Sequence, residues 1–278
     1  MSVIVNRPLV IKRPRSWGYL AYLPVYFLGV LMLLLMLVPL ILSLLVAFTP
    51  GETIDIPAPG TWSLRWFERF FNDPIWQTGA VNSALIATMT SGISLVAGTT
   101  AAIAFERYEF PAKRLFNLFI LMPLFVPPVV IGIQNLAWHQ RIGIWGSLFS
   151  LAITHSLWAT PLVFVVMRST LRGVDVKLEE AAAGMGAAPL TIFRQVTLPL
   201  ILPGLLVSAF FAFIISMNEF VMSLFLATPK TQTISTLIWP QLRYNLTPLV
   251  AAASAVLLIL TVAILFISSR LLNVKKLL

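Results

Sequence analysis

Residues 180–199 read EAAAGMGAAPLTIFRQVTLP and separate two strongly apolar blocks of the chain. Asp175, which precedes this stretch, can cap the start of a helix by accepting bonds from backbone N–H groups. Glycine tolerates the left-handed backbone at which helices stop, so Gly184 and Gly186 are expected to end this helix. Pro189 suits the first turn of a second helix, where no N–H is needed. The stretch therefore predicts two short helices joined by a tight elbow that stands out of a membrane.

The composition indicates an integral membrane protein. Hydrophobic residues make up 59% of the 278 residues and charged residues only 10%, whereas about 25% of a soluble domain is charged. Cysteine is absent, so there is neither a disulfide framework nor thiol chemistry. The net charge of +9 does not indicate a nucleic-acid partner, because the basic residues flank the apolar blocks, as they do in membrane proteins.

Six apolar blocks are long enough to cross the hydrocarbon core, which takes about 20 residues. The predicted spans are 22–48, 80–105, 115–135, 147–167, 201–227 and 248–268. They form a single transmembrane domain over residues 22–278, preceded by a basic arm at residues 1–21, and the elbow lies in the loop 168–199. The predicted fold is all-α, with six transmembrane helices.

Two of these spans have a special composition. The span 80–105 is rich in small residues, which let helices approach closely in lipid, so we expect an interior helix. Prolines interrupt the span 115–135 at positions 123, 127 and 128. Because a broken helix at membrane depth is tolerated only inside protein or beside a cavity, we expect this span to line one.

Residues 49–77 mix acidic and aromatic residues. Leu64, Phe67 and Phe71 recur at helical spacing, which predicts a short helix at the membrane interface. The tryptophans of this segment have two explanations, a position at the level of the lipid headgroups or contact with an external partner. They are Trp62, Trp66 and Trp76.

The basic residues predict the orientation. The N-terminal arm, the turn 106–114, the elbow loop and the C-terminal tail hold 14 of the 19 Lys and Arg residues. The other loops, including a short one around His139 and Arg141, hold the remaining 5. Since cytoplasmic loops carry the excess of basic residues, both termini and the elbow are expected in the cytoplasm.

The elbow carries the signature by which a known family is identified. It contains Glu-Ala-Ala, then a glycine after three intervening residues, then a valine after nine more, and finally Leu-Pro after one further residue. These residues are Glu180, Ala181, Ala182, Gly186, Val196, Leu198 and Pro199. This pattern resembles the EAA signature of bacterial ABC importer permeases, with Val196 in place of the family's isoleucine. The resemblance implies the type I ABC importer permease fold and a coupling helix that inserts into a cytoplasmic ATPase. Arg194 would help to seat the elbow. The alternative is an ordinary amphipathic loop between two spans.

One carboxylate lies within a predicted span. Of the ten Asp and Glu residues, only Glu219 does so. Asn218, Ser216 and Ser223 add polar character around it. A carboxylate at membrane depth is costly unless it faces a cavity or finds a partner, so these four residues are predicted to line a substrate pathway. Glu219 could instead be protonated or hydrogen-bonded to another helix.

Residues 216–243 extend the resemblance to the second permease subunit of spermidine/putrescine-type importers. It implies a cell inner-membrane protein that pairs with a second, distinct permease, two copies of an ABC ATPase and an extracytoplasmic substrate-binding protein. An anionic Glu219 would suit a polyamine cation. The alternatives are other cargoes of the same architecture: a phosphonate, an opine, an amino acid, sulfate or iron.

The sequence gives no sign of catalysis in this chain. A phosphate-binding GxxxxGK followed by Ser or Thr is absent, so ATP and Mg are expected on the partner ATPase, and no cofactor or metal on this chain. A secondary transporter or channel working alone would need ionisable relays in several spans, whereas only Glu219 qualifies. A membrane scaffold without a pathway does not explain Glu219 or the prolines of the third span.

Overall fold

The computed structural model describes residues 18–273, which form helices and connecting loops without a strand in that range. The predicted all-α fold is confirmed. In chain order the elements are α1 (Gly18–Val46), α2 (Arg65–Asn72), α3 (Pro74–Arg107), α4 (Lys113–Leu121), the 3₁₀ turn η1 (Met122–Phe125), α5 (Pro128–Arg141), α6 (Leu148–Arg172), α7 (Val176–Gly184), α8 (Pro189–Ile192), the π-helical turn η2 (Phe193–Thr197), α9 (Leu198–Asn218), α10 (Val221–Leu226), α11 (Ile234–Tyr244) and α12 (Pro248–Asn273). Most of the predicted arm, residues 1–21, lies outside the described residues, as do Lys275 and Lys276 of the tail.

Five helices in the described part are long and apolar enough to cross a membrane. They are α1, α3, α6, the continuous helix made of α8, η2 and α9, and α12. A sixth span is formed if α4 with η1 and α5 are taken as one, although their axes bend by 100°. The bend falls at Val126 and Pro127, where the prolines predict it, because proline cannot donate a helical hydrogen bond and clashes with the preceding turn.

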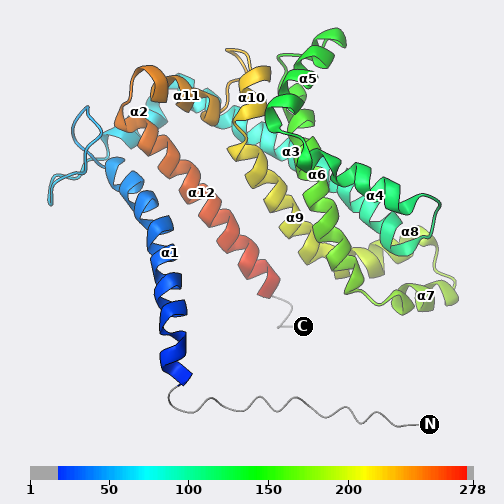
Figure 1. Cartoon of the computed structure of the whole chain (residues 1–278). Coiled ribbons are helices and arrows are strands. Elements are labelled where there is room, and N and C mark those ends of the chain that lie inside the picture. Colours follow the sequence, from blue (N-terminus) through cyan, green and yellow to red (C-terminus); the bar gives the residue numbers. More distant parts are fainter. Residues whose placement is uncertain (1–17, 274–278) are drawn as a thin grey trace.

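The centre of the molecule is a bundle of α3, α6 and α9, which lie side by side (Figure 1). Small residues of α3 make the close packing possible, as expected for an interior helix. At Gly98, a Cβ atom would lie only 2.7 Å from Cγ1 of Val163 and 3.0 Å from the backbone nitrogen of Phe164 on α6. Aromatic and apolar side chains from all three helices, including Phe105, Phe164 and Ile201, fill the interior at one end of the bundle.

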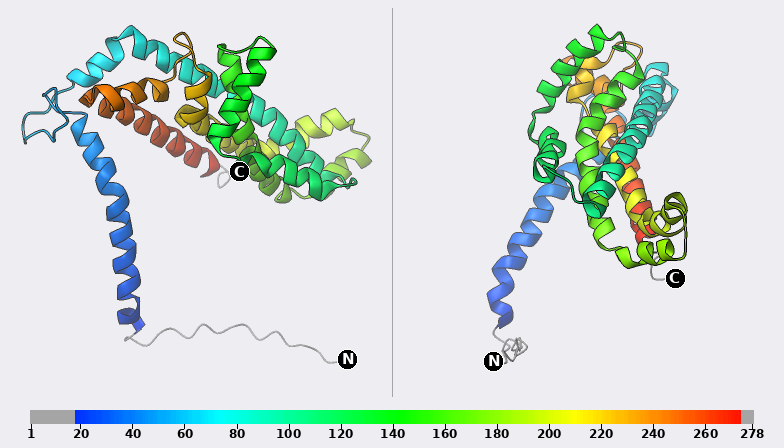
Figure 2. Two further views of the ribbon diagram at one scale, coloured as in Figure 1. Left: turned by 45° about the horizontal axis from the view of Figure 1, so that its top comes forward. Right: turned by 90° about the vertical axis from the view of Figure 1, so that its right-hand side faces the viewer.

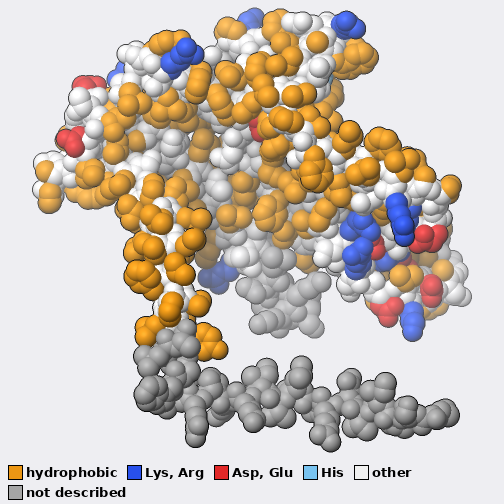
Figure 3. All heavy atoms as spheres, viewed as in Figure 1, with side chains coloured by type: hydrophobic (Ala, Val, Ile, Leu, Met, Phe, Trp, Pro, Cys, Tyr) orange, Lys and Arg blue, Asp and Glu red, His pale blue; other side chains and the backbone are white. Residues whose placement is uncertain are grey.

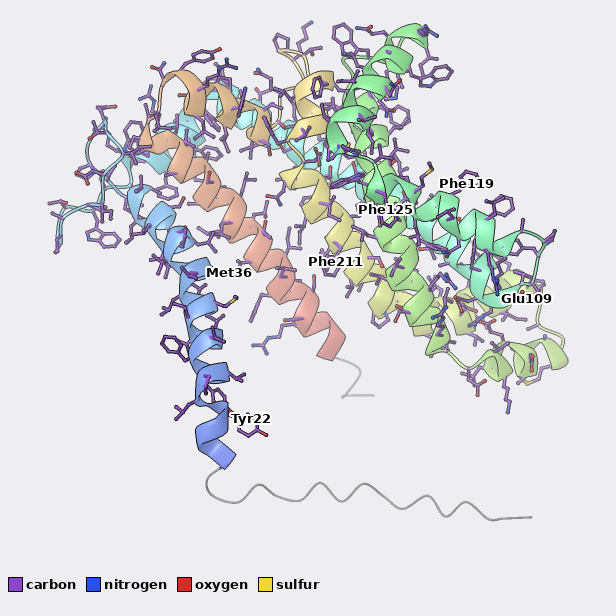
Figure 4. All side chains as sticks on the ribbon, in the orientation of Figure 1. Tyr22, Met36, Glu109, Phe119, Phe125 and Phe211 are labelled. Atoms are coloured by element: carbon purple, nitrogen blue, oxygen red, sulfur yellow. The ribbon has the colours of Figure 1, made fainter. Side chains whose placement is uncertain are left out.

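Helix α1 stands apart from the bundle and meets it only near its own C-terminal end, where Leu44 and Val46 pack on the apolar core around α2 and α12 (Figure 2). The side chains of Tyr22 and Met36 project from α1 with no other helix beside them, and Met36 is 69% exposed (Figure 4). The surface of α1 is almost wholly hydrophobic (Figure 3). Among the described residues, α1 is a span without a neighbour along most of its length.

Charged side chains of both signs cluster at one end of the molecule. Helices α7 and α8, together with the start of α4 and the loop that carries Glu109, lie at one end (Figures 1 and 4), and Lys, Arg, Asp and Glu side chains gather there (Figure 3). Helices α2, α5, α10 and α11 lie at the other end. The first described turns of α1 and the last of α12 point to the lower part of Figure 1, where α7 also lies.

The fifth span differs from the prediction at both of its ends. Its helix begins at Pro189, twelve positions earlier than residue 201, because α8 runs through η2 into α9 without a break. The second short helix of the predicted elbow is therefore the first turn of the span itself. At the other end the helix stops at Asn218, because the backbone of Glu219 is extended, with φ −73° and ψ 111°. A separate helix, α10, follows at Val221–Leu226, and the carboxylate of Glu219 accepts the N–H of Met222 in its first turn.

Three smaller expectations also need correction. His139 and Arg141 lie in the last turn of α5 rather than in a loop. The short helix α2 forms as predicted, but its buried residues are Trp66 and Phe70, while Leu64 and Phe71 are exposed. Trp66 and Trp76 belong to the packed core, so a headgroup position does not explain these two tryptophans. Helix α11 is not anticipated by the sequence pattern.

Candidate coupling elbow and substrate pathway

The elbow, residues 175–192, is built by local backbone chemistry as the sequence predicts. Oδ1 of Asp175 accepts a hydrogen bond from the N–H of Lys177 at 3.0 Å and caps α7. Gly186 has a φ of +84°, and its N–H donates to the carbonyl of Ala183 at 2.9 Å. The left-handed residue that closes the helix is thus Gly186, whereas Gly184 is the last residue of α7.

The elbow exposes a group of apolar side chains beside its charged ones. Met185, at its tip, is 83% exposed, and Val176, Leu178 and Leu190 are also exposed. Of the signature residues, Glu180 and Ala181 face solvent and Ala182 is buried. Arg194 and Pro199 are exposed on the helix that follows, and Leu198 is half-buried. A projecting apolar knob of this kind marks an interaction surface.

Glu179 fixes the elbow to the bundle. Its carboxylate accepts two hydrogen bonds from Arg107, one from Nε at 3.0 Å and one from Nη2 at 3.1 Å. It accepts a third from the hydroxyl of Thr197 at 2.9 Å. Arg107 is the last residue of α3 and Thr197 the last residue of the π turn η2. Bidentate charge-assisted bonds are among the strongest in proteins, so α7, α3 and the start of α9 are joined at one point.

A second group of ion pairs continues this connection to α6 and α4. Glu106 accepts from Nε of Arg168 at 2.6 Å and from Nε of Arg172 at 3.1 Å. Arg168 also donates to the side-chain oxygen of Asn117 at 2.8 Å. A cavity of about 390 Å³ lies between the end of α3 and the elbow, lined by residues that include Arg107, Glu179, Glu180 and Phe193. The charged end of the bundle therefore holds two neighbouring groups of ion pairs, which start from the adjacent residues Glu106 and Arg107 at the end of α3.

The four residues predicted to line a substrate pathway lie around the break between α9 and α10. Glu219 is the residue after α9, is 9% exposed, and accepts a hydrogen bond from the N–H of Met222 at 2.9 Å. Asn218 is exposed, and its Nδ2 donates to the carbonyl of Ile214 at 2.9 Å. Ser216 and Ser223 are buried and hydrogen-bonded to His155. The structure thus brings the four together, but within this chain only Asn218 is exposed.

Sequence reasoning misses four residues of these two sites. Glu179 is one position before the signature glutamate, and its partner Arg107 ends a different helix. His155 and Thr90 are single polar residues in separate spans. Nothing in their local sequence indicates the contacts, because each partner is more than 60 positions away along the chain.

Comparison with known proteins decides the family. The family model described as "Binding-protein-dependent transport system inner membrane component" matches residues 94–274. The chain belongs to this family. It is a multi-pass membrane subunit of an ABC importer, a family of translocation components rather than catalysts.

The relatives with similar sequences include permeases of polyamine importers. The chain is 30% identical over 207 residues to the spermidine/putrescine transport system permease protein PotC of Haemophilus influenzae, covering 74% of this chain and 80% of PotC. It is 28% identical over 228 residues to the putrescine transport system permease protein PotI of Escherichia coli, with 79% and 80% covered. The trehalose transport system permease protein SugB of Mycobacterium tuberculosis is 30% identical over 172 residues, with 62% and 63% covered.

Solved structures agree on the fold. The bacterial ABC transporter that imports the acidic polysaccharide alginate has a chain that matches with a TM-score of 0.66 at 18% identity, covering 93% of this chain and 98% of that one. The MetNI methionine ABC transporter matches with a TM-score of 0.57 at 18% identity, covering 72% and 93%. The permease fold predicted from the EAA signature is confirmed.

The three-way contact of Glu179 gives a direct prediction. Replacing Glu179 by Gln removes the charge that both nitrogens of Arg107 bind, which costs about 1–2 kcal/mol for a half-buried ion pair of this kind. We expect the backbone amides of α7 to exchange with deuterium roughly tenfold faster in the assembled transporter. Glu109→Gln is the matched control, because Glu109 is 90% exposed and pairs only with Lys113 on the surface. Equal exchange of α7 in both variants would show that the ion pair does not hold the elbow.

Proposed function

We propose that this chain forms part of the cargo pathway of an ATP-driven polyamine importer and that its elbow receives the motion of a cytoplasmic ATPase. The observation that carries the coupling role is the exposed apolar knob around Met185, which Glu179 fixes to two helices of the bundle, α3 and α9. The residues that we assign to ATPase contact or to the shape of the elbow are Glu180, Ala181, Ala182, Gly186, Arg194, Leu198 and Pro199. ATP and Mg are bound by the partner ATPase, and this chain needs no cofactor.

The coupling mechanism follows from the rigidity of the elbow. Interfaces and packed cores switch between discrete arrangements rather than deforming continuously. When the ATPases close on ATP, the knob moves with them, and the Glu179 contacts carry that movement to the ends of α3 and α9. The second network, through Glu106, extends it to α6 and α4. The bundle then tilts as a unit, which alternates the side on which the pathway opens.

The orientation that we propose places the elbow and both termini in the cytoplasm. The excess of basic residues on that side supports it. So does the arrangement in which the first described turns of α1 and the last of α12 point toward the part of the molecule that holds α7 (Figure 1). The opposite end, with α2, α10 and α11, then faces the substrate-binding protein. One of the alginate transporter structures with this fold was solved with its periplasmic protein bound to an alginate pentasaccharide.

A second permease completes the pathway in this proposal. Two copies of the ATPase require two elbows, and this chain supplies one. The long exposed surface of α1 is available to a partner permease as well as to lipid. We propose a heterodimer, because the spermidine/putrescine-type systems that this chain resembles use two distinct permeases.

The cargo assignment rests on the similarity to PotC and PotI and on the chemistry at the break after α9. A carboxylate beside an exposed amide, as at Glu219 and Asn218, suits an ammonium group of putrescine or spermidine by opposite-charge pairing in a site of low dielectric constant. SugB, at similar identity, carries a trehalose description, so another small solute is the alternative cargo. In this proposal the buried Ser216 and Ser223 support the residues that line the pathway and do not contact the cargo.

Gly186 provides a test of coupling. A β-branched residue is strained at a φ of +84°, although no atom would lie within 4 Å of its Cβ. In Gly186→Val we expect ATP hydrolysis to continue while cargo uptake falls by at least tenfold, because the elbow no longer presents its knob correctly. Gly184→Val is the control, since Gly184 has equally open surroundings but an ordinary backbone. Wild-type uptake in Gly186→Val would contradict the coupling role.

The cargo proposal is tested with the reconstituted complex of both permeases, the ATPase and the binding protein. Its ATPase activity is measured with putrescine, spermidine, amino acids, trehalose and anions. We expect stimulation by a polyamine, and an increase of tenfold or more in the half-maximal polyamine concentration for Glu219→Gln. The amide of Gln can still accept the N–H of Met222, so this variant removes charge while keeping the cap. Stimulation by trehalose or an anion, equal in both proteins, would overturn the polyamine assignment.

A further inference from the structure

His155 joins the two sides of the break between α9 and α10. It lies in the middle of α6 and is fully buried. Its Nδ1 is 2.9 Å from the hydroxyl oxygen of Ser216, and its Nε2 is 2.9 Å from that of Ser223. Ser216 belongs to the last turn of α9 and Ser223 to α10. One imidazole ring therefore bridges two helices that are separate only because the chain breaks at Glu219 and Phe220.

The same contacts reach the backbone of Glu219. The hydroxyl of Ser223 donates to the carbonyl of Glu219 at 3.0 Å. On the other side, the hydroxyl of Ser216 lies 3.2 Å from that of Thr90 on α3, and Thr90 is 3.2 Å from the carbonyl of Ala152 on α6. The network thus runs from α3 through α6 to both helices that flank Glu219.

The number of available protons limits which groups of the His155 network can donate and which must accept. A neutral imidazole has one donor and one acceptor nitrogen, and each serine has a single O–H. If Ser216 donates to Nδ1, the Nε2–H donates to Ser223, whose own O–H is free to donate to the carbonyl of Glu219. This tautomer is chosen from the hydrogen-bond pattern, and it satisfies the three shortest contacts together. It leaves no proton between Ser216 and Thr90, because Thr90 donates to the carbonyl of Ala152. Both nitrogens of the buried ring are thus paired by serines, one from α9 and one from α10. Loss of the ring removes this bridge, although Ser216 can then donate to Thr90 and Ser223 keeps the carbonyl of Glu219.

We infer that His155 is the positioning residue of the cargo pathway: it pins α9 and α10 together and so fixes where Glu219 and Asn218 stand. The role of Glu219 itself rests on the proposed function. Buried polar groups are costly when unpaired, so the network favours a single closed geometry of the break. Ser216 and Ser223, predicted to line the substrate pathway, serve in this inference as the two attachment points of the ring.

The chain contains a matched control for this inference. His139 is also a buried histidine, and its Nδ1 lies 2.7 Å from the hydroxyl of Ser150. That contact joins α5 to α6 and does not involve the break. Replacing either histidine by Met removes its hydrogen bonds while nearly keeping its volume, whereas Gln keeps one donor and one acceptor. The comparison of Met with Gln at each site separates hydrogen bonding from packing.

The first measurement needs no cargo. The chain has no native cysteine, and Met222, next to the break on α10, is fully buried. In the assembled transporter, a single cysteine introduced as Met222→Cys is treated with a water-soluble maleimide. We expect slow labelling when His155 is present, at least tenfold faster labelling with His155→Met, and slow labelling with His155→Gln. The His139→Met variant should label as slowly as the parent.

The second measurement is the cargo concentration that half-maximally stimulates ATP hydrolysis. His155→Met should raise it about tenfold or more with little change in the maximal rate, and His155→Gln should restore it. If His155→Met does not assemble, Ser216→Ala and Ser223→Ala each remove one attachment with little loss of volume and should show the same change more weakly. The inference would be overturned if His155→Met and His155→Gln behaved alike, or if His139→Met had as large an effect as His155→Met. If no polyamine stimulates even the parent, the cargo proposal fails, while maleimide labelling still decides the role of His155.

Discussion

The bidentate ion pair between Glu179 and Arg107 fixes the elbow to the transmembrane bundle. Without it, α7 would keep its packing against α8 and η2 but would lose its ionic contact with α3. With it, and with the hydroxyl of Thr197 on the same carboxylate, one point joins the elbow to two helices of the central bundle. A force applied to the exposed tip at Met185 therefore reaches the spans through short, directional bonds.

The second constraint is the bilayer, in which every backbone polar group must find a partner inside the protein. The chain breaks its helices twice, at Val126–Pro127 and at Glu219–Phe220, and both breaks lie against the bundle. At the second break the carboxylate of Glu219 accepts the N–H of Met222, and the hydroxyl of Ser223 donates to the carbonyl of Glu219. These two side chains supply partners that a continuous helix would have provided, and His155 holds Ser223 in place from α6.

Structural features that depend on residues close together in the chain can be predicted from the sequence. The cap at Asp175, the left-handed Gly186 and the bend at Pro127 follow from local chemistry, and the EAA pattern identifies the permease fold. The contacts that organise the sites are different, because Glu179 and Arg107 are 72 positions apart and His155 and Ser223 are 68 apart. Such pairs are set by how α3, α6, α9 and α10 cross, which no local pattern encodes. For the same reason the burial of Ser216 cannot be anticipated from its position beside Glu219.

The central claim is that the elbow is the surface on which an ATPase acts, and cross-linking at Met185 tests it most directly. Because the chain has no native cysteine, Met185→Cys places one thiol at the exposed tip, and Tyr244→Cys places one on α11 at the opposite end, where Tyr244 is 73% exposed. In the assembled transporter we expect a short bifunctional reagent to join the cysteine at position 185 to the ATPase, and the cysteine at position 244 not to reach it. A cross-link from position 244 but none from position 185 would contradict the account.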